Sequence, residues 1–296
     1  KKVYFKNLGL AIIDEQHKFG VKQRIDLSNK GGKNCDVLLM SATPIPRSLI
    51  LATYGDMDVS RLVEKPIDRK SIITLSKPEN KLNEILPFIK KQIFNKNQVF
   101  WVCPLIKESK KLDFTASIDR YNFLKKYFIK RVGLIHGELE KKNKDKVLQD
   151  FLERKIDILV STTVIEVGID FPNASLIIIE NSNKFGLSQL HQLRGRVGRG
   201  RDQGNCVLLY KNNLSENAKK RIKILKASND GFLIAEEDMR LRGFGDVLGY
   251  QQSGIKFFRL ADPVHHEDLF KLAEKNIKEI ELNEKNFKRY SLLLKL

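Results

Sequence analysis

The stretch Val99-Phe100-Trp101-Val102 is a short, continuous apolar run, and the chain repeats this pattern five more times. Continuous runs are typical of strands buried on both faces, because a strand with one solvated face alternates apolar and polar residues. The pattern therefore predicts buried strands, most of them in parallel sheets. The other five runs are at residues 10–13, 37–40, 156–160, 176–179 and 207–209.

Between these runs, apolar residues recur at the three- and four-residue spacing of amphipathic helices. One such stripe contains Leu82, Ile85 and Ile89, and two others lie at residues 121–128 and 147–152. Strands that alternate with helices predict an α/β fold with parallel sheets. Sheets of this kind bind ligands at the carboxyl ends of their strands, so the functional residues are expected there.

The predicted organisation is two α/β lobes followed by helices. A polar, Pro-containing segment marks a linker at residues 66–79, between a first lobe at 1–65 and a second at 80–212. After residue 212 the pattern predicts a helical hairpin and loop at 213–260, with Ser215 as the first N-cap, and a helical segment at 261–296.

Composition limits the classes of protein. The 296 residues are 42% hydrophobic, which excludes a wholly disordered chain, and no apolar run is long enough to predict a membrane span. Three scattered cysteines have no metal-type spacing and fit a reducing cytoplasm. The net charge is +18, and residues 71–212 contain 25 basic and 15 acidic groups. This excess suits a nucleic acid partner, although lysines on solvated faces explain it equally well.

Two acidic residues, Asp14 and Glu15, directly follow the first predicted strand. Adjacent carboxylates at a strand end are costly to hold unless a cation neutralises them. In nucleotide hydrolysis, the first acid can hold Mg²⁺ and the second can orient or deprotonate the attacking water. A polar turn with a solvated acid pair is the alternative interpretation.

Hydroxyl residues follow two further strands. Ser41 and Thr43 leave the second strand, where they can hydrogen-bond to acids on a neighbouring strand. Thr162 and Thr163 leave the strand at 156–160 and could donate to a nucleic acid phosphate. Farther along that loop, Gly168 permits close backbone approach and Asp170 could accept a ribose hydroxyl or a metal-bound water. Ordinary loops after strands are the alternative.

Four arginines lie within residues 194–201. Arg196 and Arg199 are three residues apart, so on a helix they would share a face. Guanidinium groups suit a triphosphate whose charge grows in the transition state. A purely structural role is not expected, since the cluster repels itself without an anion. A simple nucleic acid patch remains the alternative.

Four segments together resemble motifs II, III, V and VI of superfamily-two helicases, in the order found across two RecA-like lobes. They are the acid loop that begins at Asp14, the loop that begins at Ser41, residues 161–170 and residues 192–199. Longer strings at residues 14–21, 184–196 and 230–254 resemble the RecG family, bacterial DNA helicases that remodel stalled forks and branched recombination intermediates. The last string is similar to a translocation motif shared with the transcription-repair coupling factor, and His17 favours RecG.

This resemblance implies ATP and Mg²⁺ as cofactors, with Asp14 as the metal ligand and Glu15 as the residue that activates water. It also implies that Arg196 and Arg199 reach the γ-phosphate across the lobe interface. The nucleotide-contacting residues that it implies are Gly168, Asp170 and Gln192. The residues that it implies for coupling to DNA are His17, Ser41, Thr43, Thr162, Thr163, Arg240, Arg242 and Gln252.

The resemblance further implies branched or forked duplex DNA as the partner, a role in DNA repair and recombination after damage, and a cytoplasmic location. It suggests a single-strand-binding protein as another partner and implies no oligomer. The sequence contains no Gly-x-x-x-x-Gly-Lys-Ser/Thr phosphate loop. We therefore expect a carboxyl-terminal part of a longer helicase, with the first RecA-like lobe truncated at its amino terminus and no activity of the chain alone. The alternatives are a coupling-factor translocase and a non-catalytic DNA-binding remnant.

Overall fold

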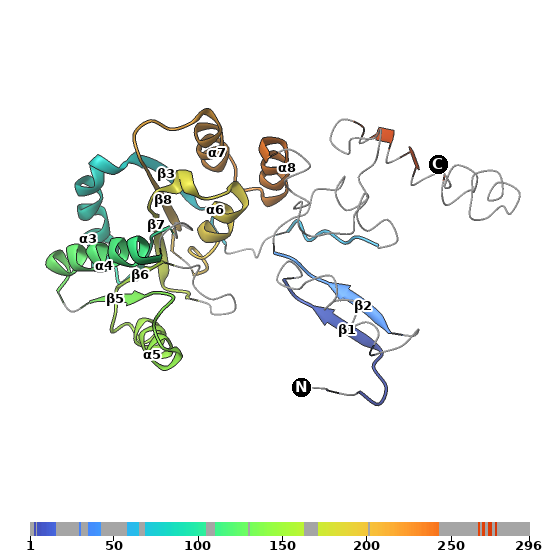
Figure 1. The fold of residues 1–296 in the computed structure, drawn as a ribbon, viewed down its shortest axis with the longest axis horizontal. Coiled ribbons are helices and arrows are strands. Elements are labelled where there is room, and N and C mark those ends of the chain that lie inside the picture. Colours follow the sequence, from blue (N-terminus) through green and yellow to red (C-terminus); the bar gives the residue numbers. More distant parts are fainter. Residues whose placement is uncertain are drawn as a thin grey trace, which may run out of the picture. The chain divides into compact units, whose positions relative to one another are not determined.

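A computed structural model of the chain separates into two compact units, residues 1–44 and 45–296 (Figure 1). Each unit is described by itself. The residues that the structure describes are 3, 5–15, 30, 35–42, 58–64, 69–104, 110–129, 131–162, 171–200, 202–242, 266, 268–269, 272–273 and 276.

The first unit contains two parallel strands, β1 (Leu10–Ile13) and β2 (Asp36–Leu39). Their register pairs Leu10 with Asp36 and Ile13 with Leu39. Ala11 and Ile13 are buried, whereas Leu10 and Ile12 are about half exposed. The strand β1 is therefore covered on one face, where its continuous apolar run predicts burial on both.

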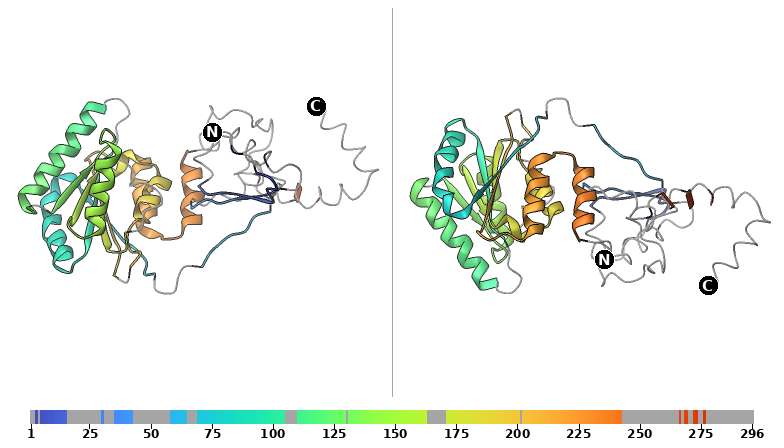
Figure 2. Two further views of the ribbon diagram at one scale, coloured as in Figure 1. Left: turned by 90° about the horizontal axis from the view of Figure 1, so that it is seen from below. Right: turned by 90° about the horizontal axis from the view of Figure 1, so that it is seen from above.

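The second unit is built on a six-stranded parallel sheet with the order β3-β8-β7-β4-β6-β5. The central strands β4 and β7 are buried along their whole length because helices cover both faces of the sheet, as Figure 2 shows. The strands are β3 (Ile73–Pro78), β4 (Gln98–Val102), β5 (Val132–Ile135), β6 (Ile158–Ser161), β7 (Ala174–Ile179) and β8 (Asn205–Tyr210).

Alternate residues of each central strand enter two different cores. In β4, Val99 and Trp101 pack with α3 and α4, whereas Phe100 and Val102 lie in the core that α5, α6, α7 and α8 cover. All four side chains are at most 1% exposed. The helices are α3 (Leu86–Phe94, after the 3-10 turn η3 at Glu79–Ile85), α4 (Lys110–Tyr127), α5 (Lys141–Leu152), α6 (Leu187–Arg194, after η4 at Ser182–Lys184), α7 (Glu216–Ala227) and α8 (Gly231–Arg242).

Right-handed crossovers explain which helix covers which face. The connections from β3 to β4 and from β4 to β5 run toward one edge of the sheet, and they contain α3 and α4. The connections from β5 to β6 and from β7 to β8 run back and contain α5 and α6. Because parallel crossovers are almost always right-handed, opposite directions place helices on opposite faces. The α/β fold predicted from the sequence is confirmed.

Two strands were not expected from the apolar runs. The linker predicted at residues 66–79 is wrong in its second half, because β3 occupies Ile73–Pro78. Ile73 is exposed and Thr74 is buried, the alternation typical of an edge strand. In the short strand β5, a Cβ on Gly133 would lie 2.8 Å from Ile156 Cδ1, so glycine allows this close packing.

The predicted helical hairpin is present. Ser215 Oγ accepts a hydrogen bond from Ala218 N at 3.3 Å, as expected for an N-cap. The next helix, α8, is described from Gly231 to Arg242. The loop after it, and most of the predicted segment at 261–296, lie outside the described residues.

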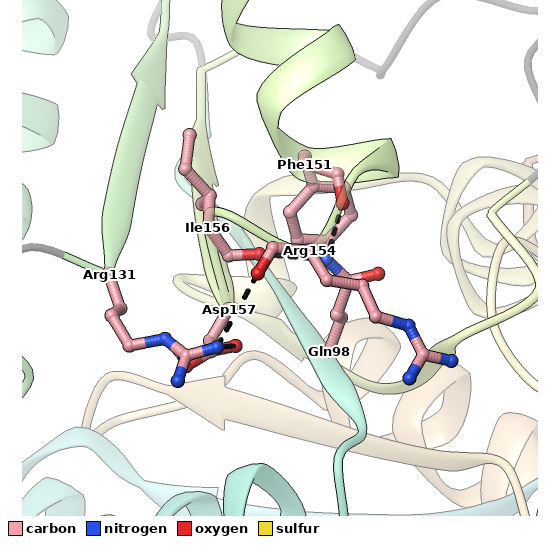
Figure 3. A network of polar contacts seen from close by, with 6 residues as sticks. All are labelled: Gln98, Arg131, Phe151, Arg154, Ile156 and Asp157. Carbon is pink, nitrogen blue, oxygen red and sulfur yellow. Dashed lines mark hydrogen bonds and ion pairs between the residues drawn. The ribbon is translucent and has the colours of Figure 1, made fainter.

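A polar network fastens the amino ends of the central strands, opposite the edge where parallel sheets bind ligands (Figure 3). Gln98 Nε2 donates to the carbonyl oxygens of Phe151 and Ile156, at 2.6 and 2.7 Å. Arg131 donates to Asp157 Oδ1 at 2.6 Å. Burial raises the pKa of Asp157, and the Arg131 guanidinium opposes this shift. The network holds the turn between α5 and β6 against β4.

No helix in the described part of the chain is long and apolar enough to cross a membrane.

Candidate functional site

The acid loop begins where β1 ends. Asp14 is exposed and its Oδ1 accepts a hydrogen bond from Glu15 N at 2.8 Å. Glu15 has a φ of 50°, in the left-handed region that costs a non-glycine residue about 1–2 kcal/mol. Such conformations cluster at functional sites, because surrounding structure must hold them.

The loop that begins at Ser41 leaves the neighbouring strand at the same edge. Met40 N donates to Ile13 O at 2.8 Å, so the ladder between β1 and β2 continues one residue beyond β2. Since the two strands are parallel and in register, Asp14 and Ser41 both leave at their carboxyl ends. Two further predicted residues of these loops, His17 and Thr43, lie outside the described residues.

The acid loop suits a hard cation. Mg²⁺ takes oxygen ligands and is usually held by one or two carboxylates, with water and substrate phosphates completing its octahedron. The exposed Asp14 carboxylate provides one such ligand. Among the described residues there is no group of three or more His, Cys, Asp or Glu side chains that could form a complete metal site.

In the six-stranded sheet, the crossovers that leave β4 and β7 run in opposite directions, which makes their carboxyl ends a switch point. A buried polar cluster lies there. Trp101 Nε1 donates to Glu180 Oε1 at 2.8 Å, and Arg120 of α4 forms an ion pair with the same carboxylate. Burial raises the pKa of Glu180, whereas Arg120 and Trp101 oppose the shift. The cluster fixes the chain that leads from β7 toward α6.

This raised pKa predicts a pH effect on stability. The native state holds the Glu180 proton more tightly than the unfolded chain, whose carboxyl has an ordinary pKa of 4.5. The contribution of Glu180 to stability is thus fully present below that value and decreases as pH rises through the native pKa. Glu180→Gln should flatten this decrease in urea unfolding across a pH series. Glu84→Gln is the control, because Lys77 lowers the pKa of Glu84, and its effect should have the opposite sign. Equal effects would contradict the assignment.

Thr162 follows β6 at the same carboxyl edge. Its side chain is 4% exposed, and its Oγ1 has no hydrogen-bond partner within the described ranges. The predicted residues Thr163, Gly168 and Asp170, in the loop that follows, lie outside the described part.

Most of the arginine segment is not helical. The helix α6 ends at Arg194, and Gly198 has a φ of 68°, so Arg196 and Arg199 lie on a loop. Glycine is favoured at such a φ because it has no Cβ. Arg199 is exposed and its Nε donates to Gly195 O at 3.1 Å. Gln192 lies within α6 and is partly exposed.

One arginine of the cluster is structural, contrary to the expectation that all bind an anion. Arg194 is 1% exposed, and its Nη1 donates to the carbonyl oxygens of Leu225 and Ser228, at 2.6 and 2.8 Å. These carbonyls belong to the end of α7, where the helix dipole favours a cation. Burial lowers the pKa of Arg194, a cost that these hydrogen bonds offset.

We expect Arg194→Met to destabilise the chain by about 3–5 kcal/mol, because it removes a buried charge-assisted network and leaves the carbonyls of α7 unsatisfied. The control Arg199→Met changes an exposed arginine of the same segment and should cost less than about 0.5 kcal/mol. Urea unfolding of residues 1–296 measures both. Similar losses in the two variants would show that Arg194 is not the structural member.

The other end of α6 is bound to α8. Ser188, in the first turn of α6, donates from its Oγ at 2.5 Å and from its N at 3.4 Å to Asp238 Oδ2. From α7, Arg221 Nη1 donates to Phe185 O at 2.7 Å, just before α6. Sequence analysis missed Asp238 and Arg221, whose partners are 50 and 36 residues away, so no local pattern marks them.

Of the predicted coupling residues in the helical hairpin, Arg240 forms an ion pair with Glu237 at 2.9 Å on the exposed side of α8. Arg242 is the last residue of α8, and nothing is described of its side chain. Gln252 lies outside the described residues.

Comparison with known proteins gives two family matches. The helicase conserved C-terminal domain matches residues 79–201, and the C-terminal part of domain 3 of the ATP-dependent DNA helicase RecG matches residues 228–292. The first match covers most of the six-stranded sheet, and the second begins just before α8.

Curated relatives include the ATP-dependent DNA helicase RecG of Thermotoga maritima, 47% identical over 95% of this chain, and that of Bacillus subtilis, 49% identical over 89%. The chain spans only 36% and 39% of the lengths of these two relatives. A solved structure of RecG bound to a three-way DNA junction has a TM-score of 0.69 and 45% identity, over 91% of this chain and 34% of that one. The Mycobacterium smegmatis helicase Lhr, with 16% identity and a TM-score of 0.52 over 73% of this chain and 31% of that one, shows the fold alone.

Proposed function

Because the chain belongs to the RecG family and corresponds to its carboxyl-terminal part, we propose that it supplies the acid loop, the arginine loop and the coupling helices of an ATP-dependent DNA helicase. Its proposed substrates are branched or forked DNA duplexes, such as stalled forks and recombination intermediates. The solved RecG relative was captured on a three-way DNA junction, which supports this class of substrate.

Three segments have separate tasks in this proposal. Asp14 would hold Mg²⁺, which neutralises the phosphate oxygens of a bound ATP, and Glu15 would orient or deprotonate the attacking water. Arg196 and Arg199 would balance the charge that develops on the transferred phosphoryl group. Gly168, Asp170 and Gln192 are the further residues proposed to contact the nucleotide.

The observation that carries the coupling role is that both ends of α6 are hydrogen-bonded to the helical hairpin. Asp238 of α8 binds the first turn of α6, and Arg194 in its last turn binds the end of α7. The loop with Arg196 and Arg199 follows α6 directly. A rotation of that loop on ATP hydrolysis would therefore move α7 and α8 with it. This movement would be transmitted to DNA through Arg240, Arg242 and Gln252.

Two alternatives are weaker. A transcription-repair coupling factor would share the translocation segment, but the family profile that matches residues 228–292 is that of RecG. A non-catalytic DNA-binding remnant would not need the unfavourable backbone conformation of Glu15. A cytoplasmic location and a single-strand-binding protein as a further partner are proposed from the family resemblance.

The test measures ATP hydrolysis and the unwinding of forked DNA separately. It uses a complete chimaera, in which this chain replaces the matching segment of the Thermotoga maritima relative. Asp238→Ala should keep DNA-stimulated ATP hydrolysis within about threefold but lower fork unwinding by at least about tenfold, because α6 loses its link to α8. Arg242→Ala and Gln252→Ala should act in the same way.

The control is Glu236→Ala, which changes an exposed acid of α8 and should preserve both activities. Unfolding curves of each variant show whether the helices remain folded. Equal losses of hydrolysis and unwinding in a folded Asp238→Ala protein would place this residue in the ATP site and contradict the coupling role.

A further inference from the structure

A groove of about 420 Å³ lies beside α7, and none of its lining residues is assigned a role above. Its floor is apolar and includes Leu214 and the buried Ile222. Ser76 in β3 and Tyr210 at the end of β8 also line it. The volume lies within the range of roughly 300–1,000 Å³ that is typical of ligand pockets.

Lysines form the rim of this groove. Lys219, Lys223 and Lys226 follow one another at four- and three-residue intervals, so they share one face of α7. Lys219 Nζ already binds Glu216 at 2.7 Å. No ion pair joins Lys223 or Lys226 to a carboxylate elsewhere in the described ranges. The helix contains five basic residues and one acidic residue, which leaves it strongly positive.

We propose that this groove is a docking site for an acidic peptide segment, which places one apolar side chain on the floor and its carboxylates against the lysine rim. The groove combines an apolar floor with a positively charged rim, and this combination distinguishes a peptide from a nucleic acid. A nucleic acid backbone would use the lysines but has no group for a concave apolar floor. A peptide supplies both groups along one short stretch of chain. This proposal is independent of the helicase function.

The chain of residues 1–296 can be tested directly with a labelled Asp-Asp-Leu-Asp-Asp peptide by fluorescence anisotropy. The matched peptide Asp-Asp-Ser-Asp-Asp has the same charge and lacks the apolar side chain. We expect the leucine peptide to bind at least about tenfold more tightly, because burying a leucine side chain is worth more than one factor of ten in affinity. Equal affinities would overturn the proposal.

Two variants locate the site. Ala227→Phe fills the groove without changing charge, and Lys223→Glu reverses one rim charge. Each should weaken the leucine peptide by at least about tenfold. The control Lys220→Glu makes the same charge change on an exposed residue of α7 that does not line the groove, and its effect should be small. Since Lys223 is exposed, Lys223→Glu keeps the test decisive if Ala227→Phe fails to fold.

Two results would overturn the assignment. Equal weakening by Lys223→Glu and Lys220→Glu would indicate attraction to the general positive charge of α7. A thymidine oligonucleotide whose binding is lost in folded Ala227→Phe, while the leucine peptide still binds, would make the groove a nucleic acid site.

Discussion

Replacing Glu15 by Gln in the complete chimaera should leave ATP binding largely intact and lower ATP hydrolysis by about a hundred- to ten-thousand-fold. The amide has the shape of the carboxylate but cannot accept a proton from the attacking water. Asp14, the proposed Mg²⁺ ligand, is unchanged, so the nucleotide should still bind. Glu15 has a left-handed backbone, with a φ of 50°, which is unfavourable for a residue with a Cβ.

The matched control is Asp36→Asn, which makes the same chemical change in an exposed acid at the amino end of β2. It should leave hydrolysis unchanged. Steady-state ATPase with forked DNA gives the rates, and equilibrium binding of a labelled nucleotide gives the affinities. Near-normal hydrolysis by Glu15→Gln would remove Glu15 from the reaction, and loss of nucleotide binding would make it a binding residue instead.

The parts of the fold that were predictable are those whose sequence pattern is local. The run Val99–Val102 predicts a strand covered on both faces, and β4 has that environment because helices lie over both of its faces. The strand β3 was missed because an edge strand alternates exposed and buried residues and lacks a continuous apolar run. The short strand β5 contains Gly133, which has no side chain and so leaves space for the side chain of Ile156.

The same distinction applies to the site. The acid pair after β1 and the hydroxyl residue after β2 were predictable, because both follow parallel neighbouring strands. The buried role of Arg194 was not, because its partners Leu225 and Ser228 lie 31 and 34 residues away. In sequence, Arg194 looks like Arg196 and Arg199. Only the packing of α6 against α7 separates the structural arginine from the loop arginines.

The second large effect concerns the chain by itself. Residues 1–296 should not hydrolyse ATP at a measurable rate, because the sequence has no phosphate loop. Such a loop supplies backbone N–H donors, a lysine for the β- and γ-phosphates and a hydroxyl for Mg²⁺. Each tenfold in rate corresponds to about 1.4 kcal/mol, so losing several of these contacts should cost many factors of ten. Asp14, Glu15 and the arginine loop supply only part of the required set.

The central claim is that this chain contributes the acid, arginine and coupling parts of a motor whose nucleotide also needs a phosphate loop from another segment. Steady-state ATPase of purified residues 1–296 with forked DNA, measured beside the complete chimaera, tests it most directly. The account predicts DNA-stimulated hydrolysis by the chimaera and none above background by residues 1–296. Comparable turnover by both proteins would contradict it, because the chain would then hold and hydrolyse the nucleotide unaided.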